Sequence, residues 1–153
     1  MEILIAYYSR TNVTKSIAEA LQKKLNCDIE EIDDLGKHSG KIGWVKGGYQ
    51  ASRVKECEIR TVKKNPADYD LVIIGTPVWA SKLSSPMYTY IQQFKNDFKD
   101  VACFTTCISK GEEGTYNQLK ELTGKELKAT LSLNKETIKN PDSKINEFIE
   151  KVK

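Results

Sequence analysis

Short, nearly uninterrupted apolar runs constrain the fold of this chain most, because they recur along its length between helical patterns. Ile3–Tyr8 and Leu71–Gly75 are the clearest of these runs. Strands covered on both faces have such sequences, and they are typical of parallel sheets. Further strands are predicted at Asp28–Ile32, Val101–Thr106 and Leu127–Leu133.

Amphipathic patterns fill the intervals between these strands. Val13–Leu25 places apolar residues on one helical face, with Asn12 as a candidate N-cap. Ser85 and Pro86 form a helix start, and Gly124 is a candidate C-terminal cap. Helices are therefore expected at Val13–Leu25, from Ser85 onward, around Thr115–Leu122 and from Asn140 onward. Five alternations of strand and helix predict an α/β fold with helices on both faces of a parallel sheet.

The chain has 153 residues, of which 39% are apolar and 29% charged, so we expect one ordinary globular domain spanning 1–153. No apolar run is long enough to span a bilayer, and the N-terminus lacks a basic leader. A cytoplasmic location is the resulting expectation. The segment Gly36–Pro66 is weakly periodic, which is compatible either with a roof over a binding site or with surface packing.

The four cysteines and single histidine do not form a recognisable metal-binding pattern. Reduced thiols and no metal site are expected. The net charge is +3, without a basic block interleaved with aromatic residues, so nothing favours a nucleic-acid partner. The mild positive charge suits an acidic protein or an anionic cofactor.

Polar and aromatic residues gather in three segments that follow predicted strands, at 9–14, 76–83 and 106–114. In open α/β sheets, ligands bind at the carboxyl ends of the strands, where the strand order reverses. The candidate site is therefore these three segments together.

The first segment has hydroxyl or amide side chains at four of six positions, namely Ser9, Thr11, Asn12 and Thr14. A single residue suffices for helix capping, so the cluster predicts a phosphate nest at the helix start. The segment has neither the Walker motif nor the dinucleotide glycine fingerprint, and it lacks a cysteine nucleophile. A phosphomonoester is the remaining ligand.

The second segment places Pro77, Val78 and Trp79 directly after a buried strand. Such a segment can lie against a planar aromatic ligand, although packing of Trp79 in the core is the alternative. Residues 107–111 can then close the far side of the ring.

These motifs resemble the flavodoxin family: Ser9-Arg10-Thr11-Asn12-Val13-Thr14 after the first strand, Gly75-Thr76-Pro77-Val78-Trp79 after the third, and Thr105-Thr106 after the fourth. The resemblance implies a three-layer sandwich with a five-stranded parallel sheet in the order 2-1-3-4-5, and non-covalent FMN. It assigns the FMN phosphate to the first loop and the ribityl chain and ring to the other two. The implied binding residues are Ser9, Arg10, Thr11, Asn12, Val13, Thr14, Thr76, Pro77, Val78, Trp79, Ala80, Thr106, Cys107, Ser109 and Gly111.

The chain departs from the family's pattern in three respects. Asn12 stands where a glycine is common in the phosphate loop, and Ala80 and Ser81 stand where a glycine often lies beside the flavin. A peptide flip that requires positive φ costs more free energy without glycine. Electron-carrying flavodoxins are also usually acidic, whereas this chain has a net charge of +3.

Three functions follow from the resemblance. The first is an electron carrier between redox protein partners in the cytoplasm, without a catalytic residue of its own. The second is an FMN-dependent NAD(P)H:quinone-type oxidoreductase with a small quinone-like acceptor, although no nicotinamide motif is recognisable. The third is a binding module that has lost its flavin, against which the retained hydroxyl cluster and Trp79 argue.

Overall fold

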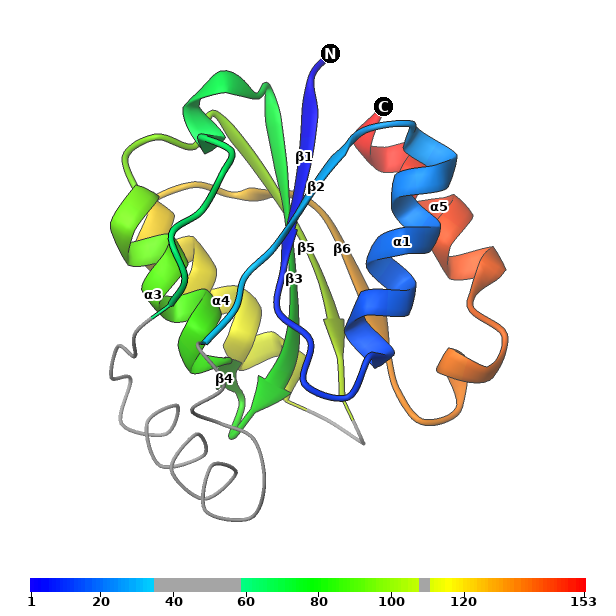
Figure 1. The fold of residues 1–153 in the computed structure, drawn as a ribbon. Helices are drawn as coiled ribbons and strands as arrows, with labels where there is room; N and C mark the ends of the chain where they lie inside the picture. The colour runs from blue at the N-terminus through cyan, green and yellow to red at the C-terminus, as the bar shows by residue number, and fades with distance from the viewer. Residues whose placement is uncertain (35–58, 108–110) are drawn as a thin grey trace.

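The computed structural model describes residues 1–34, 59–107 and 111–153, in which a parallel sheet lies between two layers of helices (Figure 1). The parallel strands run in the spatial order β2-β1-β3-β5-β6. They are β1 (Ile3–Tyr7), β2 (Asp28–Glu31), β3 (Leu71–Trp79), β5 (Asp100–Thr106) and β6 (Leu127–Leu133). Numbered by themselves along the chain, these five have the predicted order 2-1-3-4-5. The sequence did not predict a sixth, short strand, β4 (Lys82–Leu83), which pairs antiparallel with β3.

Helices cover both faces of the sheet, as predicted (Figure 1). One face carries α1 (Val13–Leu25) and α5 (Asp142–Val152), and the other carries α3 (Ser85–Phe94) and α4 (Glu112–Thr123). Two short 3-10 helices, η1 (Pro66–Asp68) and η2 (Thr137–Lys139), precede β3 and α5. No helix in the described ranges is both long and apolar enough to cross a membrane.

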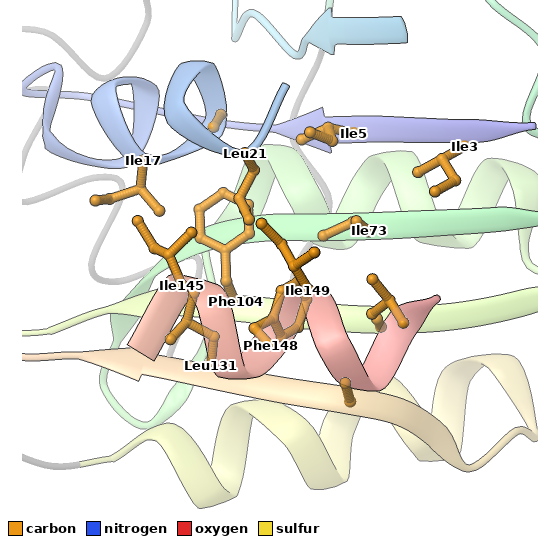
Figure 2. Close-up of a cluster of buried hydrophobic side chains, with 14 of the residues drawn as sticks. Ile3, Ile5, Ile17, Leu21, Ile73, Phe104, Leu131, Ile145, Phe148 and Ile149 are labelled. Carbon is orange, nitrogen blue, oxygen red and sulfur yellow. The ribbon is translucent and has the colours of Figure 1, made fainter. Parts of the chain in front are cut away.

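Successive residues of the central strands face opposite layers, which explains their continuous apolar sequences. In β1, Ile3 and Ile5 belong to the cluster under α1 and α5, whereas Leu4 and Ala6 belong to the cluster under α3 and α4. Figure 2 shows the first cluster, where Phe104 reaches from the sheet toward helix residues such as Leu21 and Phe148. Burial on both faces stabilises the sheet through removal of apolar surface from water.

The strand register brings several carboxyl ends to one edge of the sheet. Tyr7 of β1 pairs with Gly75, and Pro77 farther along β3 pairs with Thr106 of β5. Gly75 is required where it lies, because a Cβ there would be 2.2 Å from Cζ of Phe104. The three predicted site segments therefore start from neighbouring positions.

The observed helix boundaries agree with the predicted ones where the amphipathic pattern is strong. The bounds of α1 are those predicted, and Gly124 caps α4 in the left-handed region with φ 68°. Asn12 occupies the N-cap position of α1, but with φ 68° and without a capping hydrogen bond from its side chain. Helix α4 begins at Glu112, earlier than the predicted Thr115. Most of the Gly36–Pro66 segment lies outside the described residues.

Candidate functional site

The loop between β1 and α1 ends in a helix start with a positive partial charge. The Ser16 N–H donates to the Asn12 carbonyl at 3.0 Å, so the N–H groups of Val13, Thr14 and Lys15 precede the helical hydrogen-bond ladder. The first turn of α1 contains no acidic residue. This end of the helix therefore favours an anion.

Ser9 has the feature of this loop that points most directly to a ligand. Its Oγ is buried and has no hydrogen-bond partner among the described residues. Buried polar atoms are nearly always hydrogen-bonded, because an unpaired one has lost its interaction with water. A phosphate oxygen at the start of α1 would supply the missing acceptor, so the residues present fit an anionic phosphate group.

Two other predicted ligands, Thr14 and Thr106, bind each other. Their hydroxyl oxygens are 2.8 Å apart, and both side chains are buried. This hydrogen bond joins the first turn of α1 to the end of β5, so it fixes the β1–α1 loop relative to the third predicted segment. The two residues are 92 positions apart in the sequence, so their contact with each other could not be predicted. Each had been predicted to bind a ligand.

The prediction that residues 76–83 form a loop is wrong. Strand β3 continues to Trp79, because Pro77 pairs with Thr106 and Val78 pairs with Leu83 of β4. Ala80 and Ser81 form the turn of this hairpin, with φ values of 51° and 61°. Two-residue hairpin turns of type I′ have positive φ at both positions, because this geometry matches the twist of the flanking strands, and Ala80 and Ser81 adopt it without glycine.

The hairpin packs closely against the start of α4. A Cβ at Gly114 would lie 2.3 Å from the Ser81 carbonyl oxygen, and Gly111 has φ 119°. The Leu83 N–H donates to Oε1 of Gln118 at 2.8 Å. Helix α4 therefore holds the hairpin that carries Trp79.

Trp79 is half-buried at the end of β3, where it packs against the margin of the cluster under α3 and α4 and contacts Tyr8 of that cluster. The two ring centroids are 5.7 Å apart at an angle of 87°. The Tyr8 hydroxyl donates to Oδ2 of buried Asp34 at 3.1 Å. Tyr8 and Asp34 thus orient the indole, a role that the sequence analysis did not assign to either residue.

One cavity of about 1000 Å³ brings the three predicted segments together. Its lining includes eight predicted residues: Arg10, Thr11, Val13, Val78, Trp79, Ala80, Thr106 and Cys107. It also includes four residues that the sequence analysis missed: Leu133, Asn134, Lys135 and Ile138. The sequence did contain a signal for them, because these residues end or follow the strand β6, whose carboxyl end lies at the same edge of the sheet as the other segments.

The other predicted residues that the structure describes do not line this cavity. Thr76 is fully buried, and its hydroxyl forms hydrogen bonds with Ser84 inside the hairpin. Asn12 and Gly111 shape the starts of α1 and α4, and Pro77 lies within β3. Ser109 lies outside the described residues.

Cys107 lines the cavity but is a poor nucleophile. Burial raises the pKa of its thiol above the ordinary value, and the neighbouring Glu112 carboxylate raises it further. The Sγ atom donates to Oε2 of Glu112 at 3.9 Å. The thiol is therefore protonated at neutral pH and contributes to the cavity mainly as a small wall residue.

Comparison with known proteins identifies the family of this chain. A family model described as Flavodoxin matches residues 2–152.

The chain belongs to the flavodoxin family.

Solved structures of flavodoxin-like proteins agree with the fold described above. A flavoprotein from Lactobacillus acidophilus NCFM, in complex with FMN, has a TM-score of 0.76 at 23% identity, over 97% of this chain and 98% of that chain. Oxidised Flavodoxin 2 from Bacillus cereus has a TM-score of 0.58 at 18% identity, over 99% of both chains. A WrbA-like flavodoxin from Agrobacterium tumefaciens has a TM-score of 0.56 at 14% identity, over 97% of this chain and 98% of that chain. No curated protein sequence matches the chain.

Proposed function

We propose that this member of the flavodoxin family binds FMN without a covalent link and carries electrons between protein partners. The observation that carries the proposal is the buried Ser9 Oγ in the β1–α1 loop, which has no partner among the described residues, together with the cavity lined by residues from the three predicted segments. The similar flavoprotein from L. acidophilus was crystallised with FMN, which supports the choice of flavin.

The phosphate end of the proposed site is the β1–α1 loop. Ser9, Thr11 and the first N–H groups of α1 would hold the phosphate, with the helix start supplying partial positive charge. Arg10 lines the same cavity and adds a full positive charge. These groups need not reorganise when the cofactor binds, because the Thr14–Thr106 hydrogen bond already fixes the loop.

The ring end of the proposed site is the β3–β4 hairpin. Val78, Trp79 and Ala80 line the cavity and would contact the planar ring system. FMN would supply the redox chemistry there, while the protein residues bind and orient it and limit its contact with water. The edge-to-face contact with Tyr8 holds the Trp79 indole in place for this contact.

An electron carrier suits the described lining better than an enzyme that processes a second substrate. None of the described residues around the cavity is Asp, Glu or His, and the Cys107 thiol has a raised pKa. An NAD(P)H:quinone-type oxidoreductase has to move protons as well as electrons, and it benefits from a positioned acid or base. The oxidoreductase is the alternative function that the experiment compares with the electron carrier.

The decisive experiment is a titration of the purified protein with FMN, followed by two redox assays. We expect one FMN per chain, rapid electron exchange with a reduced redox protein, and NAD(P)H oxidation no faster than with free FMN. Absence of FMN binding would contradict the proposal. Rapid NAD(P)H oxidation with added quinone would instead establish the oxidoreductase.

A further inference from the structure

The turn between β6 and η2 belongs to the same cavity as the phosphate loop. Lys135 and Asn134 from this turn line the cavity together with Arg10 and Thr11 of the β1–α1 loop. The two segments are brought together because α1 and α5 cover the same face of the sheet (Figure 1). This turn therefore adds a second cation, Lys135, to the lining of the cavity that contains Arg10.

Hydrogen bonds fix the backbone on both sides of Lys135. Oδ1 of Asn134 accepts from the N–H groups of Glu136 at 2.9 Å and Thr137 at 3.0 Å, while the Asn134 N–H donates to Oγ1 of Thr137 at 2.8 Å. The Leu133 carbonyl accepts from the Cys107 N–H at 3.0 Å, which ties the turn to the end of β5. Lys135 thus projects from a preorganised turn rather than from a loose loop.

The charges around the cavity indicate what Lys135 would bind. Lys135 is exposed and has no ion-pair partner within the described part of the chain. Arg10 is the other charged residue in the described lining, which contains no carboxylate. Two cations and a helix start around one cavity favour a multiply charged anion over a neutral ligand.

We propose that Lys135 binds the phosphate of FMN and makes the site select the phosphorylated flavin over riboflavin. The proposal rests on the proposed function, because it assumes that FMN occupies this cavity. It assigns a cofactor-binding role to the turn after β6, where the sequence analysis expected none. Lys135 acts through charge, so arginine would replace it and glutamine would not.

The experiment compares the dissociation constants of FMN and riboflavin for four proteins, measured by quenching of flavin fluorescence. These are the unmodified chain, Lys135→Gln, Lys135→Arg and the control Lys139→Gln, which removes an exposed lysine of η2 that does not line the cavity. For Lys135→Gln we expect about fivefold weaker FMN binding, the scale of an exposed ion pair, and nearly unchanged riboflavin binding. Lys135→Arg and Lys139→Gln are expected to match the unmodified chain.

Salt provides a second readout that does not depend on redox activity. FMN affinity of the unmodified chain is expected to fall more steeply with sodium chloride than that of Lys135→Gln, because screening weakens the interaction that the variant lacks. Equal losses for FMN and riboflavin, or no loss for either, would overturn the role of Lys135 while leaving FMN binding intact. Failure of the unmodified chain to bind FMN would overturn the proposed function itself.

Discussion

Hydroxyl side chains of the site fall into two physically different groups. The Oγ atom of Ser9 is buried without a described partner, so it is ready to bind a ligand but contributes no hydrogen bond to the fold. The hydroxyls of Thr14 and Thr106 bind each other and already stabilise the protein without a ligand. Substitutions at these positions should therefore separate cofactor binding from stability.

Ser9→Ala is expected to leave the stability of the cofactor-free protein unchanged or slightly raised, because it removes a buried polar atom that has no partner in the described ranges. FMN binding should weaken by about 1.5–3 kcal/mol, the scale of a hydrogen bond to a charged group. Urea unfolding of the cofactor-free protein and an FMN titration measure the two effects. A clear loss of stability without FMN would show that Ser9 has a structural partner.

Thr14→Val is expected to behave differently, because the hydroxyl of Thr106 would then be left buried without its partner. The free energy of unfolding of the cofactor-free protein should fall by about 1–3 kcal/mol. A double-mutant cycle with Thr106→Val checks the pairing, since the two losses should not add. Additive losses would mean that the two hydroxyls act independently.

At the scale of elements, the hairpin formed by β3 and β4 is the feature that gives the site its aromatic wall. Its turn consists of Ala80 and Ser81, both in the left-handed region. Non-glycine residues are disfavoured in this region by about 1–2 kcal/mol each. The pairing of Val78 with Leu83 and the packing against Gly114 keep the turn in place despite that cost.

Ala80→Gly should therefore stabilise the protein, although glycine loses more conformational entropy on folding. The net gain expected is about 0.5–1 kcal/mol, measured by thermal unfolding of the cofactor-free protein. Ala67→Gly in η1 is the control, because Ala67 does not have positive φ and the change should destabilise. A loss of stability in Ala80→Gly would indicate that the methyl group makes contacts that outweigh the backbone strain.

Helices and strands with a strong hydrophobic periodicity were predictable from the sequence. Strand segments that depend on pairing with another strand were not. Helix α1 and strand β6 have the predicted bounds because their apolar residues recur at helical and near-alternating spacing. The extension of β3 through Pro77 was missed, because proline and polar neighbours resemble a loop until their strand partners are known. Strand β4 has two residues, which is too short to carry a pattern.

In the candidate site too, residues that carry a sequence motif were predictable, whereas contacts between distant residues were not. Sequence motifs selected the segments after β1, β3 and β5, and the cavity contains residues from all three. The turn after β6 was missed because Asn134 and Lys135 match no motif. The Thr14–Thr106 contact and the Asp34–Tyr8–Trp79 arrangement depend on residues far apart in sequence, so only the folded structure reveals them.

At the scale of the whole molecule, the sheet separates two apolar clusters, and its carboxyl edge carries the segments that line the cavity. Structural elements from both faces of the sheet contribute to the site. Helix α1 on one face supplies the lining residue Val13, and α4 on the other face holds the hairpin that supplies others. A ligand in the cavity would contact both layers at once. Ligand binding should therefore be coupled to global unfolding rather than to a local loop.

Added FMN is expected to raise the midpoint of thermal unfolding by about 5–10 °C when its concentration is one hundred times the dissociation constant. This value follows from about 2.7 kcal/mol of stabilisation by linkage and the usual unfolding entropy of a chain of this size. Differential scanning calorimetry measures the shift, and a single transition in both states checks the coupling. Two separate transitions, with FMN moving one of them, would contradict it.

The edge-to-face pair of Tyr8 and Trp79 gives the molecule an internal optical probe. At a centroid separation of 5.7 Å, we expect the excitation energy absorbed by the Tyr8 phenol to transfer to the indole by dipole coupling. The fluorescence of Trp79 would then respond to changes around either ring. A yellow chromophore against that indole would in turn accept its excitation. Replacing the other tryptophan, Trp44, with phenylalanine would leave Trp79 as the single indole. Its fluorescence would then measure the occupancy of the cavity without an attached dye.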